Sequence, residues 1–283
     1  MEALTDGAGW TWAIPLHDGT LSVGTVLGTE ALAERRERLG SLDAVFDDAL
    51  AASPDTTGLT EHAERVGPVR AFRDYSYFAE RFGGPGFRLA GDAAGFVDPL
   101  FSSGVHMAFL GGLSAAASIC SELRDELSVA ECERFHHRCL SQAYTRFMVT
   151  VAGFYRQLRR QDDIVLPGIT RENWQLAFDL IQPVVSGDVD VGADDIPDEV
   201  LQRTMKYTTD MMLEAHEFGT DNGVARLMVK RAFDDSVTDR FGAVDGHYIR
   251  LRRGRLGVAS LGKVGGAAAG VARALIRGVV SRL

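Results

Sequence analysis

The sequence predicts an α+β or α/β chain in which strands dominate up to about residue 92 and helices follow. Two patterns predict this order. Apolar runs at 10–16 and 21–27 flank the turn letters HDGT, which is typical of a β-hairpin. From residue 105 onward the apolar residues recur at helical spacing instead. We therefore expect a sheet-containing first part that leads into a mainly helical second part.

Between the hairpin and residue 92 the pattern alternates between helix and strand. Residues 29–53 read as one helix, with Thr29 as its cap and Pro54 as its stop. Residues 66–78 read as extended chain. The Gly-rich turn GGPG then leads into a short apolar strand at 87–90. This strand runs directly into the letters GDAAGF.

The second part is predicted to be helical almost throughout. A helix rich in small residues is expected at 105–123 and a long amphipathic helix at 129–160. An acidic loop follows at 186–199, and a basic amphipathic helix at 267–283 ends the chain. We divide the chain accordingly into a sheet-containing first part at 1–125, a helical region at 126–245 and a basic tail at 246–283.

The charge is unevenly distributed along the chain. The net charge is −9, but the part from 246 to 283 contains no acid and eight basic residues, so residues 1–245 carry −9 − 8 = −17. An acidic body argues against nucleic-acid binding by that body. The basic residues are Arg250, Arg252, Arg253, Arg255, Lys263, Arg273, Arg277 and Arg282.

Composition points to an ordinary globular protein in a reducing compartment. The chain has 283 residues, of which 46% are hydrophobic, so it can build a core without disulfides. Its three cysteines are an odd number and give no disulfide framework. The first residues resemble no signal peptide, and we expect no apolar run of membrane-spanning length. We therefore expect a cytoplasmic protein with no membrane span.

The stretch FRLAGDAAGFVDPLFSSGVHMAFLGG at 87–112 carries the chemistry. Gly91 allows a ligand to approach the backbone closely, and Asp92 at a strand end can accept hydrogen bonds from hydroxyl groups. Ser103 and Gly104 then open a helix, whose first N–H groups can bind an anion or a carbonyl. This arrangement suits the ribityl chain and ring edge of a flavin. A plain strand–loop–helix connection with an incidental aspartate fits the same residues.

This stretch resembles the second flavin motif of the FAD-dependent halogenases, a branch of the aromatic-hydroxylase-like flavoproteins. The GDAAG letters are shared by many flavoenzymes, whereas FVDPLFSSGVH is similar to the halogenases that act on phenols and pyrroles. The resemblance implies that Asp92 binds the ribityl chain and that Ser103 and Gly104 lie beside the flavin ring and the halide. The implied flavin-binding residues are Gly91, Asp92, Asp98, Pro99, Ser102, Ser103 and Gly104. Tryptophan halogenases carry a catalytic glutamate where this chain has Phe101, which favours a phenol or pyrrole over free tryptophan.

A second signature, WTWAIP, stands near the start of the chain. It is similar to the W-x-W-x-I-P motif of flavin-dependent halogenases and comprises Trp10, Trp12, Ile14 and Pro15. In a strand the two tryptophans face the same side, where they could wall a passage and exclude water from a reactive species. Packing of the two indoles within a sheet or core is the commoner use of such a pair. The letters DYSY at 74–77 lie between the two signatures, in the family's order.

The resemblance implies an enzyme that halogenates an electron-rich aromatic ring in secondary metabolism. Its cofactor is FAD, supplied in reduced form by a separate flavin reductase, and its co-substrate is chloride or bromide. The substrate is a small aromatic compound, free or tethered to a carrier protein. The alternatives are a monooxygenase of the same superfamily, and a non-catalytic remnant or a subunit of a split enzyme.

Two expected parts of such an enzyme are missing from the sequence. No G-x-G-x-x-G turn for a dinucleotide pyrophosphate occurs. The family's essential lysine precedes the flavin motif, whereas the three lysines here, Lys206, Lys230 and Lys263, all follow it. We therefore expect an incomplete FAD-binding flavoprotein core with no identifiable catalytic residue, and a chain that is inactive alone.

Three smaller clusters have an ordinary structural explanation as well as a functional one. Cys132, His136 and Cys139 have helical spacing and could bind a metal, but no fourth ligand is evident, so core or surface positions on a helix fit better and we expect no metal site. The acidic run DVDVGADD at 188–195 fits a solvated loop better than a calcium site. His106 could serve as a base, or it could pack in the first turn of a buried helix.

Overall fold

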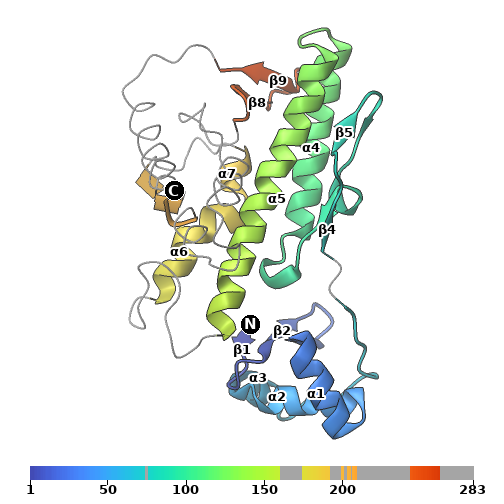
Figure 1. The fold of residues 1–283 in the computed structure, drawn as a ribbon, viewed down its shortest axis with the longest axis vertical. Coiled ribbons are helices and arrows are strands. Elements are labelled where there is room, and N and C mark those ends of the chain that lie inside the picture. The colour runs from blue at the N-terminus through green and yellow to red at the C-terminus, as the bar shows by residue number, and fades with distance from the viewer. Residues whose placement is uncertain are drawn as a thin grey trace. The chain divides into compact units, whose positions relative to one another are not determined.

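The computed structural model describes residues 1–73, 76–159, 174–191, 199–200, 203–204, 206–208 and 243–261 (Figure 1). The chain forms two compact units. The first comprises Met1–Asp74 with Phe154–Val165, and the second comprises Tyr75–Gly153 with Leu166–Leu283. Strands come first and long helices follow, as the sequence predicts. The functional division at residues 125 and 245 stays a prediction.

A three-stranded antiparallel sheet in the order β1-β2-β3 organises the first unit; its strands are β1 Glu2–Ala3, β2 Gly9–Pro15 and β3 Leu21–Leu27. The β2–β3 pair is the hairpin that the apolar runs predict. At its turn the Asp18 carboxylate accepts hydrogen bonds from the backbone N–H and the hydroxyl of Thr20, at 3.0 and 2.7 Å. Gly19 takes a positive φ of 83°, which glycine adopts without strain. The prediction of this hairpin is confirmed.

Three short helices complete the first unit where the sequence predicts one: α1 Thr29–Leu39, α2 Leu42–Ala51 and α3 Pro54–Thr60. The prediction of one continuous helix is wrong because Gly40, with a φ of 79°, ends α1 and Ser41 caps α2 by accepting the N–H of Ala44 at 3.1 Å. Thr29 makes no capping hydrogen bond, since Gly28 is the cap residue of α1. Pro54 begins α3 rather than ending a helix, a position where its missing N–H costs nothing.

Two helices dominate the second unit, α4 Gly104–Leu123 and α5 Val129–Arg159, which run side by side in Figure 1. Both agree with the sequence prediction to within a residue. The side of α5 that carries Phe135, Leu140 and Phe147 is fully buried. These large side chains form much of the core of this unit, as an amphipathic helix requires.

Short strands and single turns of 3₁₀ helix lead from the first unit to α4; they are β4 Tyr77–Phe78, β5 Gly83–Gly84, β6 Phe87–Arg88, η1 Gly91–Ala93, β7 Gly95–Phe96 and η2 Pro99–Phe101. β4 pairs with β7, and β5 pairs with β6 around the GGPG turn. Of the extended segment expected at 66–78, Tyr77 and Phe78 are in a strand among the residues that the structure describes.

The helix α4 has the length and composition of a membrane span, contrary to our expectation of no such apolar run. Among the described helices it is the one that passes this test, and 44% of its apolar window is buried. A core helix of a soluble protein passes the same test. On its buried side it presents small and polar residues such as Ser114, Ser118 and Ser121, each of which makes a side-chain hydrogen bond.

A β-hairpin packs against α4 in the region that the sequence predicts only as the start of a basic tail. Its strands are β8 His247–Arg250 and β9 Gly257–Ser260, and β9 contacts α4. Ser121 of α4 accepts the N–H of Val258 at 2.8 Å. Two further helices, α6 Trp174–Val185 and α7 Asp188–Val191, belong to the same unit. The predicted basic helix at 267–283 lies outside the described residues.

Candidate functional site

The strand that precedes the flavin motif approaches α4 very closely. Gly91 has a positive φ of 58°, and a Cβ built on it would lie 3.4 Å from Cβ of Ala108 on α4. From the other side, a Cβ on Gly111 of α4 would lie 3.1 Å from Ala90 and 3.3 Å from the nitrogen of Gly91. Two glycines therefore let the loop and the helix meet: a side chain at Gly111 would crowd Ala90, and one at Gly91 would be strained by the positive φ.

A buried histidine fixes the end of this strand. The carbonyl of Leu89 can only accept, so Nε2 of His136 donates to it, at 2.9 Å. Nδ1 of His136 is then the acceptor for the Ser114 hydroxyl, at 2.8 Å. Burial lowers the pKa of His136 to about 4, so the ring is neutral at physiological pH. Both nitrogens are used within the protein, which leaves no lone pair for the metal considered with Cys132 and Cys139.

Two tyrosines hold the GDAAG loop through hydrogen bonds from their hydroxyl groups to its backbone carbonyls. The hydroxyl of Tyr144 on α5 donates to the carbonyl of Gly95 at 2.9 Å and lies 3.4 Å from that of Gly91. Burial raises the pKa of Tyr144 to about 12, so it stays a donor. Tyr77 donates its hydroxyl to the carbonyl of Asp92. With its backbone held in this way, Asp92 presents an exposed side chain.

The second loop of the motif turns tightly into α4. The Asp98 carboxylate accepts the N–H of Leu100 at 3.0 Å, and Pro99 begins the 3₁₀ turn. Ser102 then takes the left-handed conformation, with φ 53° and ψ 36°. Such a conformation is uncommon for a residue other than glycine, and it redirects the chain into the helix. The motif residues 98–104 are thus brought together in one compact turn.

The first turn of α4 offers unpaired N–H groups at an exposed position. Ser103 is the cap residue and is buried, and its carbonyl accepts the N–H of Met107 at 2.9 Å. Gly104 begins the helix and is exposed; a Cβ built on it would meet open space. The N–H groups that precede Met107 have no partner within the helix, and the positive end of the helix dipole lies there. This arrangement can bind an anion or an electron-rich oxygen.

In the same first turn, His106 joins a buried charged cluster that the sequence does not reveal. Nε2 of His106 lies 3.0 Å from Oδ2 of Asp190, and Arg146 on α5 forms an ion pair with the same carboxylate. Burial raises the pKa of Asp190, but the charge of Arg146 and the hydrogen bond from His106 outweigh it, so the pKa is lowered and the carboxylate stays ionised. The sequence analysis expected Asp190 in a solvated acidic loop, and this expectation is wrong. Asp190 is buried and anchors the start of α4.

The position of His106 also depends on a glycine after α6. A Cβ on Gly187 would lie 2.0 Å from Cε1 of His106, and this glycine has a φ of 80°. Phe147 packs on the other side, with ring centroids 5.8 Å apart. His106 is half-buried and pairs with Asp190. Its surroundings therefore fit the expectation of a side chain that packs in the first turn of the helix, and the ion pair is an additional contact.

The two tryptophans of the first signature lie next to each other in the first unit. Their ring centroids are 5.9 Å apart on the same face of β2, as strand geometry predicts. Nε1 of Trp10 donates to the hydroxyl of Tyr155 at 3.0 Å, and Nε1 of Trp12 donates to Ser22 at 3.3 Å. Gly24, opposite Trp12 in the register, leaves room for its ring. Trp10 is buried, and these contacts are packing contacts within the unit.

The remaining residues of the two signatures take ordinary positions. Ile14 and Pro15 are exposed at the end of β2, and Phe101 is half-buried in the 3₁₀ turn before α4. Cys132 and Cys139 are buried, and burial raises the pKa of both thiols, to about 12 for Cys139. Among the described residues no group of three or more histidine, cysteine or acidic side chains is arranged to hold a metal ion.

Comparison with known proteins gives consistent matches. A family model described as tryptophan halogenase matches residues 1–165. Sulochrin halogenase gedL of Aspergillus terreus is 45% identical over 193 residues, which cover 68% of this chain and 35% of that protein. Flavin-dependent halogenase armH4 of Armillaria mellea is 42% identical over 222 residues, which cover 74% of this chain and 42% of that protein.

A solved structure is similar as well. The crystal structure of CmlS, a flavin-dependent halogenase, matches with a TM-score of 0.51 and 28% identity, covering 76% of this chain and 36% of that one. The chain thus spans less than half the length of each of these three proteins.

Proposed function

The chain belongs to the tryptophan halogenase family of flavin-dependent halogenases, and from this premise we propose that it is the flavin-contacting part of an enzyme that halogenates an electron-rich aromatic ring. The observation that carries the proposal is the loop from Gly91 to Gly104. It ends in exposed helix N–H groups and carries an exposed aspartate. Reduced FAD, when bound, supplies the oxygen chemistry that oxidises the halide.

The residues of the loop fit a flavin. Asp92 would accept hydrogen bonds from the ribityl hydroxyls, and Gly91 leaves the backbone open to the ligand. The chain turn at Asp98, Pro99 and Ser102 would lie along the ring. The first N–H groups of α4, at Ser103 and Gly104, would hold the halide, because the helix start favours negative charge and no Cβ blocks it.

The substrate class is proposed from one position in this loop. Phe101 stands where tryptophan halogenases carry a glutamate, so we propose a phenol or pyrrole rather than free tryptophan. Trp10 and Trp12, with Ile14 and Pro15, are proposed to exclude water and bulky groups from the reactive halogen species. A separate flavin reductase would supply reduced FAD, and the aromatic substrate would arrive free or on a carrier protein.

We also propose that this chain does not act alone. Its sequence contains no G-x-G-x-x-G turn and no lysine before the flavin motif. The complete enzyme would therefore need a nucleotide-binding segment, which would bring both features. A split enzyme of two polypeptides and a single longer polypeptide are equally consistent with this proposal.

The test is halogenation by the chain combined with such a segment, a flavin reductase and chloride or bromide. Gly104→Val should reduce halogenation about 100-fold or more, because its side chain would fill the space in front of the helix N–H groups, and removal of comparable donors has such effects. Asp92→Ala should weaken FAD binding. The matched control is Gly67→Val, since a Cβ at Gly67 also meets open space.

Three outcomes would count against the proposal. Product that carries oxygen without halogen, and that forms at the same rate without halide, would indicate a monooxygenase. No turnover under any condition would indicate a non-catalytic protein. Normal halogenation by the Gly104→Val variant, with its fold unchanged by circular dichroism, would show that the halide lies elsewhere.

A further inference from the structure

A buried carboxylate links the start of α4 to two other helices of the second unit. Asp190 lies on α7, and its Oδ2 is 3.0 Å from Nε2 of His106 on α4. Its other oxygen, Oδ1, accepts a hydrogen bond from Arg146 on α5. The side chains of Asp190 and Arg146 are 1% and 6% exposed. The three residues therefore form one network that joins α4, α5 and α7 inside the protein.

The charges in this network determine which ring nitrogen of His106 carries a hydrogen. Burial alone would raise the pKa of Asp190, but the charge of Arg146 and the hydrogen bond from His106 outweigh burial and lower it. An ionised carboxylate only accepts hydrogen bonds, so Nε2 of His106 carries a hydrogen and donates it. A hydrogen bond to a charged acceptor is stronger than one between neutral groups. The side chain of His106 is therefore held in one orientation.

The turn that carries Asp190 is held by contacts of its own. The N–H of Gly187 donates to the carbonyl of Val184 at 3.1 Å, and the N–H of Asp190 donates to the carbonyl of Gly187 at 3.0 Å. Val189 within this turn is fully buried. Gly187 also packs against the imidazole, since a Cβ on it would lie 2.0 Å from Cε1 of His106. The partner of His106 is thus a fixed support.

Within the part of the chain that the structure describes, the first turn of α4 has few other polar contacts. The side chain of Ser103, the cap residue, makes no capping hydrogen bond. Gly104 has no side chain, and Val105 is 69% exposed. His106 is the third residue of the helix, and its own N–H precedes the first hydrogen bond within the helix, which is that of Met107. The side chain of His106 therefore supplies the polar contact that fixes the direction of these first N–H groups.

These are the N–H groups that we propose as the halide site. A hydrogen bond weakens steeply when the donor turns away from its acceptor, so the anion is held only while the N–H groups keep their direction. Fixing them before the anion arrives lowers the cost of binding it. The negative charge of Asp190 is balanced by Arg146, so this support does not repel a nearby anion as an unpaired carboxylate would.

The support comes from a later part of the chain than the flavin motif. The family model matches residues 1–165, which include His106 and Arg146 but not Asp190. The start of α4 is therefore attached, through one hydrogen bond, to the helical region that follows the matched residues.

We propose that His106 is a positioning residue of the halide site: its hydrogen bond to Asp190 aligns the first N–H groups of α4, so that the turn at 187–190 sets how tightly halide is bound. This inference rests on the proposed function and adds a residue to its site. His106 acts through the backbone of the helix start and not by touching the halide.

Three variants of the full chain separate this role from a general effect on stability. His106→Phe keeps a ring that packs against Gly187 but cannot donate to Asp190. His106→Gln is the conservative variant, because its amide N–H can reach the carboxylate as Nε2 does. Ser121→Ala is the control, since it removes a buried hydrogen bond near the other end of the same helix.

A second pair of variants tests the same hydrogen bond from the side of α7. Asp190→Asn replaces the charged acceptor with a neutral one, so it should act in the same direction as His106→Phe but more weakly. Its matched control is Asp188→Asn in the same turn, because the carboxylate of Asp188 accepts from Ser186 at 2.6 Å and not from His106.

The first measurement needs neither flavin nor halide. Amide hydrogen exchange of the chain follows the first hydrogen-bonded N–H groups of α4, at 107–109. They should exchange about tenfold faster in His106→Phe, because the helix start opens locally once its support is lost. In His106→Gln, Ser121→Ala and Asp188→Asn they should exchange at the wild-type rate.

The second measurement uses the chain completed with a nucleotide-binding segment, FAD and a flavin reductase. The KM for bromide should rise about tenfold in His106→Phe, while kcat at saturating bromide changes by less than about twofold. His106→Gln, Ser121→Ala and Asp188→Asn should keep the wild-type KM for bromide. A merely structural role would reduce the amount of active protein, and so lower kcat without moving this KM.

Three results would overturn the proposal. Unchanged exchange at 107–109 in both His106→Phe and Asp190→Asn would show that the network does not hold the first turn. Faster exchange with an unchanged KM for bromide would show that the first turn does not govern halide binding. Equal changes in His106→Phe and Ser121→Ala would reduce the effect to stability.

Failure of the proposed function gives a different result. If the wild-type protein does not halogenate under any condition, the halide part of this inference falls with the proposed function. The exchange measurement still decides whether His106 holds the helix start, because it is made on the chain without halide or turnover.

Discussion

His136 shows how one buried side chain positions the proposed flavin loop. It lies on α5, yet it holds the carbonyl of Leu89, two residues before Gly91, and it is fixed in one tautomer by Ser114. A neutral imidazole is required for this, because the protonated ring would present two donors and leave Ser114 facing a donor. Burial enforces the neutral form by lowering the pKa to about 4.

This lowered pKa makes the fold sensitive to acid. In the unfolded chain the histidine titrates near 6.5, so the folded state binds fewer protons between pH 6.5 and about 4. Stability is therefore highest above pH 6.5 and falls as the pH drops toward 4, by about 3 kcal/mol for this group. In the His136→Gln variant, the loss of folding stability between pH 6.5 and 4 that this histidine causes should vanish. The free energy of unfolding, measured with denaturant at pH 7, 5.5 and 4.5, checks this prediction.

The control for that measurement is His17→Gln, since His17 is exposed on the β2–β3 turn. It should show the same pH dependence as the wild-type chain. If the His136→Gln and wild-type curves stay parallel from pH 7 to 4.5, the assigned tautomer and its hydrogen bonds are wrong.

At the residue scale, sequence reasoning finds local geometry and misses distant partners. The helix start at Gly104 and the shared face of the two tryptophans depend on neighbouring residues, so spacing predicts them. The cluster of His106 and Asp190 joins positions 84 residues apart, and the acidic composition around Asp190 points to solvent instead. A buried carboxylate cannot be told from an exposed one without its partner.

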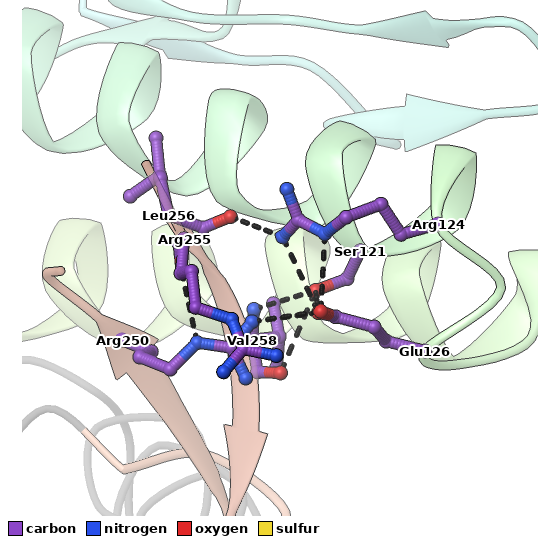
Figure 2. Close-up of polar contacts among 7 residues, drawn as sticks. All are labelled: Ser121, Arg124, Glu126, Arg250, Arg255, Leu256 and Val258. Carbon is purple, nitrogen blue, oxygen red and sulfur yellow. Dashed lines mark hydrogen bonds and ion pairs between the residues drawn. The ribbon is translucent and has the colours of Figure 1, made fainter. Parts of the chain in front are cut away.

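At the element scale, the hairpin of β8 and β9 is a second case in which the sequence does not reveal a distant partner. It also explains how α4 ends. Glu126, just after α4, accepts from Ser121, Arg124 and Arg250 at 2.9, 3.0 and 2.8 Å (Figure 2). Hydrogen bonds from Arg124 and then Ser121 lower the pKa of Glu126 to about 2. The Arg-rich letters predict a basic tail but do not identify its partner, because the acid that binds Arg250 lies 124 residues earlier.

Between α4 and the hairpin, we expect the hydrogen bonds of Ser121 to contribute more to stability than the ion pairs of Glu126. Ser121 is fully buried and accepts the N–H of Val258, while it donates to Glu126. Ser121→Ala should destabilise the chain by about 1–3 kcal/mol, because it leaves a buried N–H without an acceptor. Glu126→Gln should have a smaller effect, because its ion pairs are exposed to solvent. Hydrogen exchange at the amides of 247–250 and 257–260 measures both.

Glu37→Gln on α1 is the control, since Glu37 is an exposed acid remote in sequence from the hairpin. The wild-type hairpin should also lose protection as the pH falls from 4.5 toward 2, where Glu126 takes up its proton. Equal exchange in Ser121→Ala and the wild-type chain would mean that β9 does not depend on this contact.

At the scale of the whole molecule, the order of strands and helices follows from the sequence, but the grouping into units does not. Hydrophobic periodicity is a local signal, so it predicts α4 and α5 to within a residue. It does not predict that Phe154–Val165 joins the first unit, where Tyr155 binds Trp10. The sequence predicts α4 as an apolar helix rich in small residues, and the structure shows which of these residues are buried and which are exposed.

The distribution of charge over the molecule bears on the partner that delivers the substrate. Residues 246–283 carry eight basic residues and no acid, against −17 in the rest. One of the eight, Arg250, is paired within the protein to Glu126, which agrees with a tail that lies over its own acidic surface. Arg252, Arg253 and Arg255 are exposed. The alternative is that the tail attracts an acidic carrier protein that bears the substrate.

Deleting residues 262–283 from the completed enzyme distinguishes the two, and it spares β9, whose loss would disturb α4. If the tail attracts a carrier, turnover on a carrier-bound substrate should fall about tenfold at low salt, with turnover on the free substrate unchanged. The loss should shrink as salt rises, because screening weakens attraction between exposed charges. A full-length variant with Lys263, Arg273, Arg277 and Arg282 replaced by Gln controls for the missing chain and should behave like the deletion. Equal losses on both substrates, independent of salt, would leave the tail with a structural role.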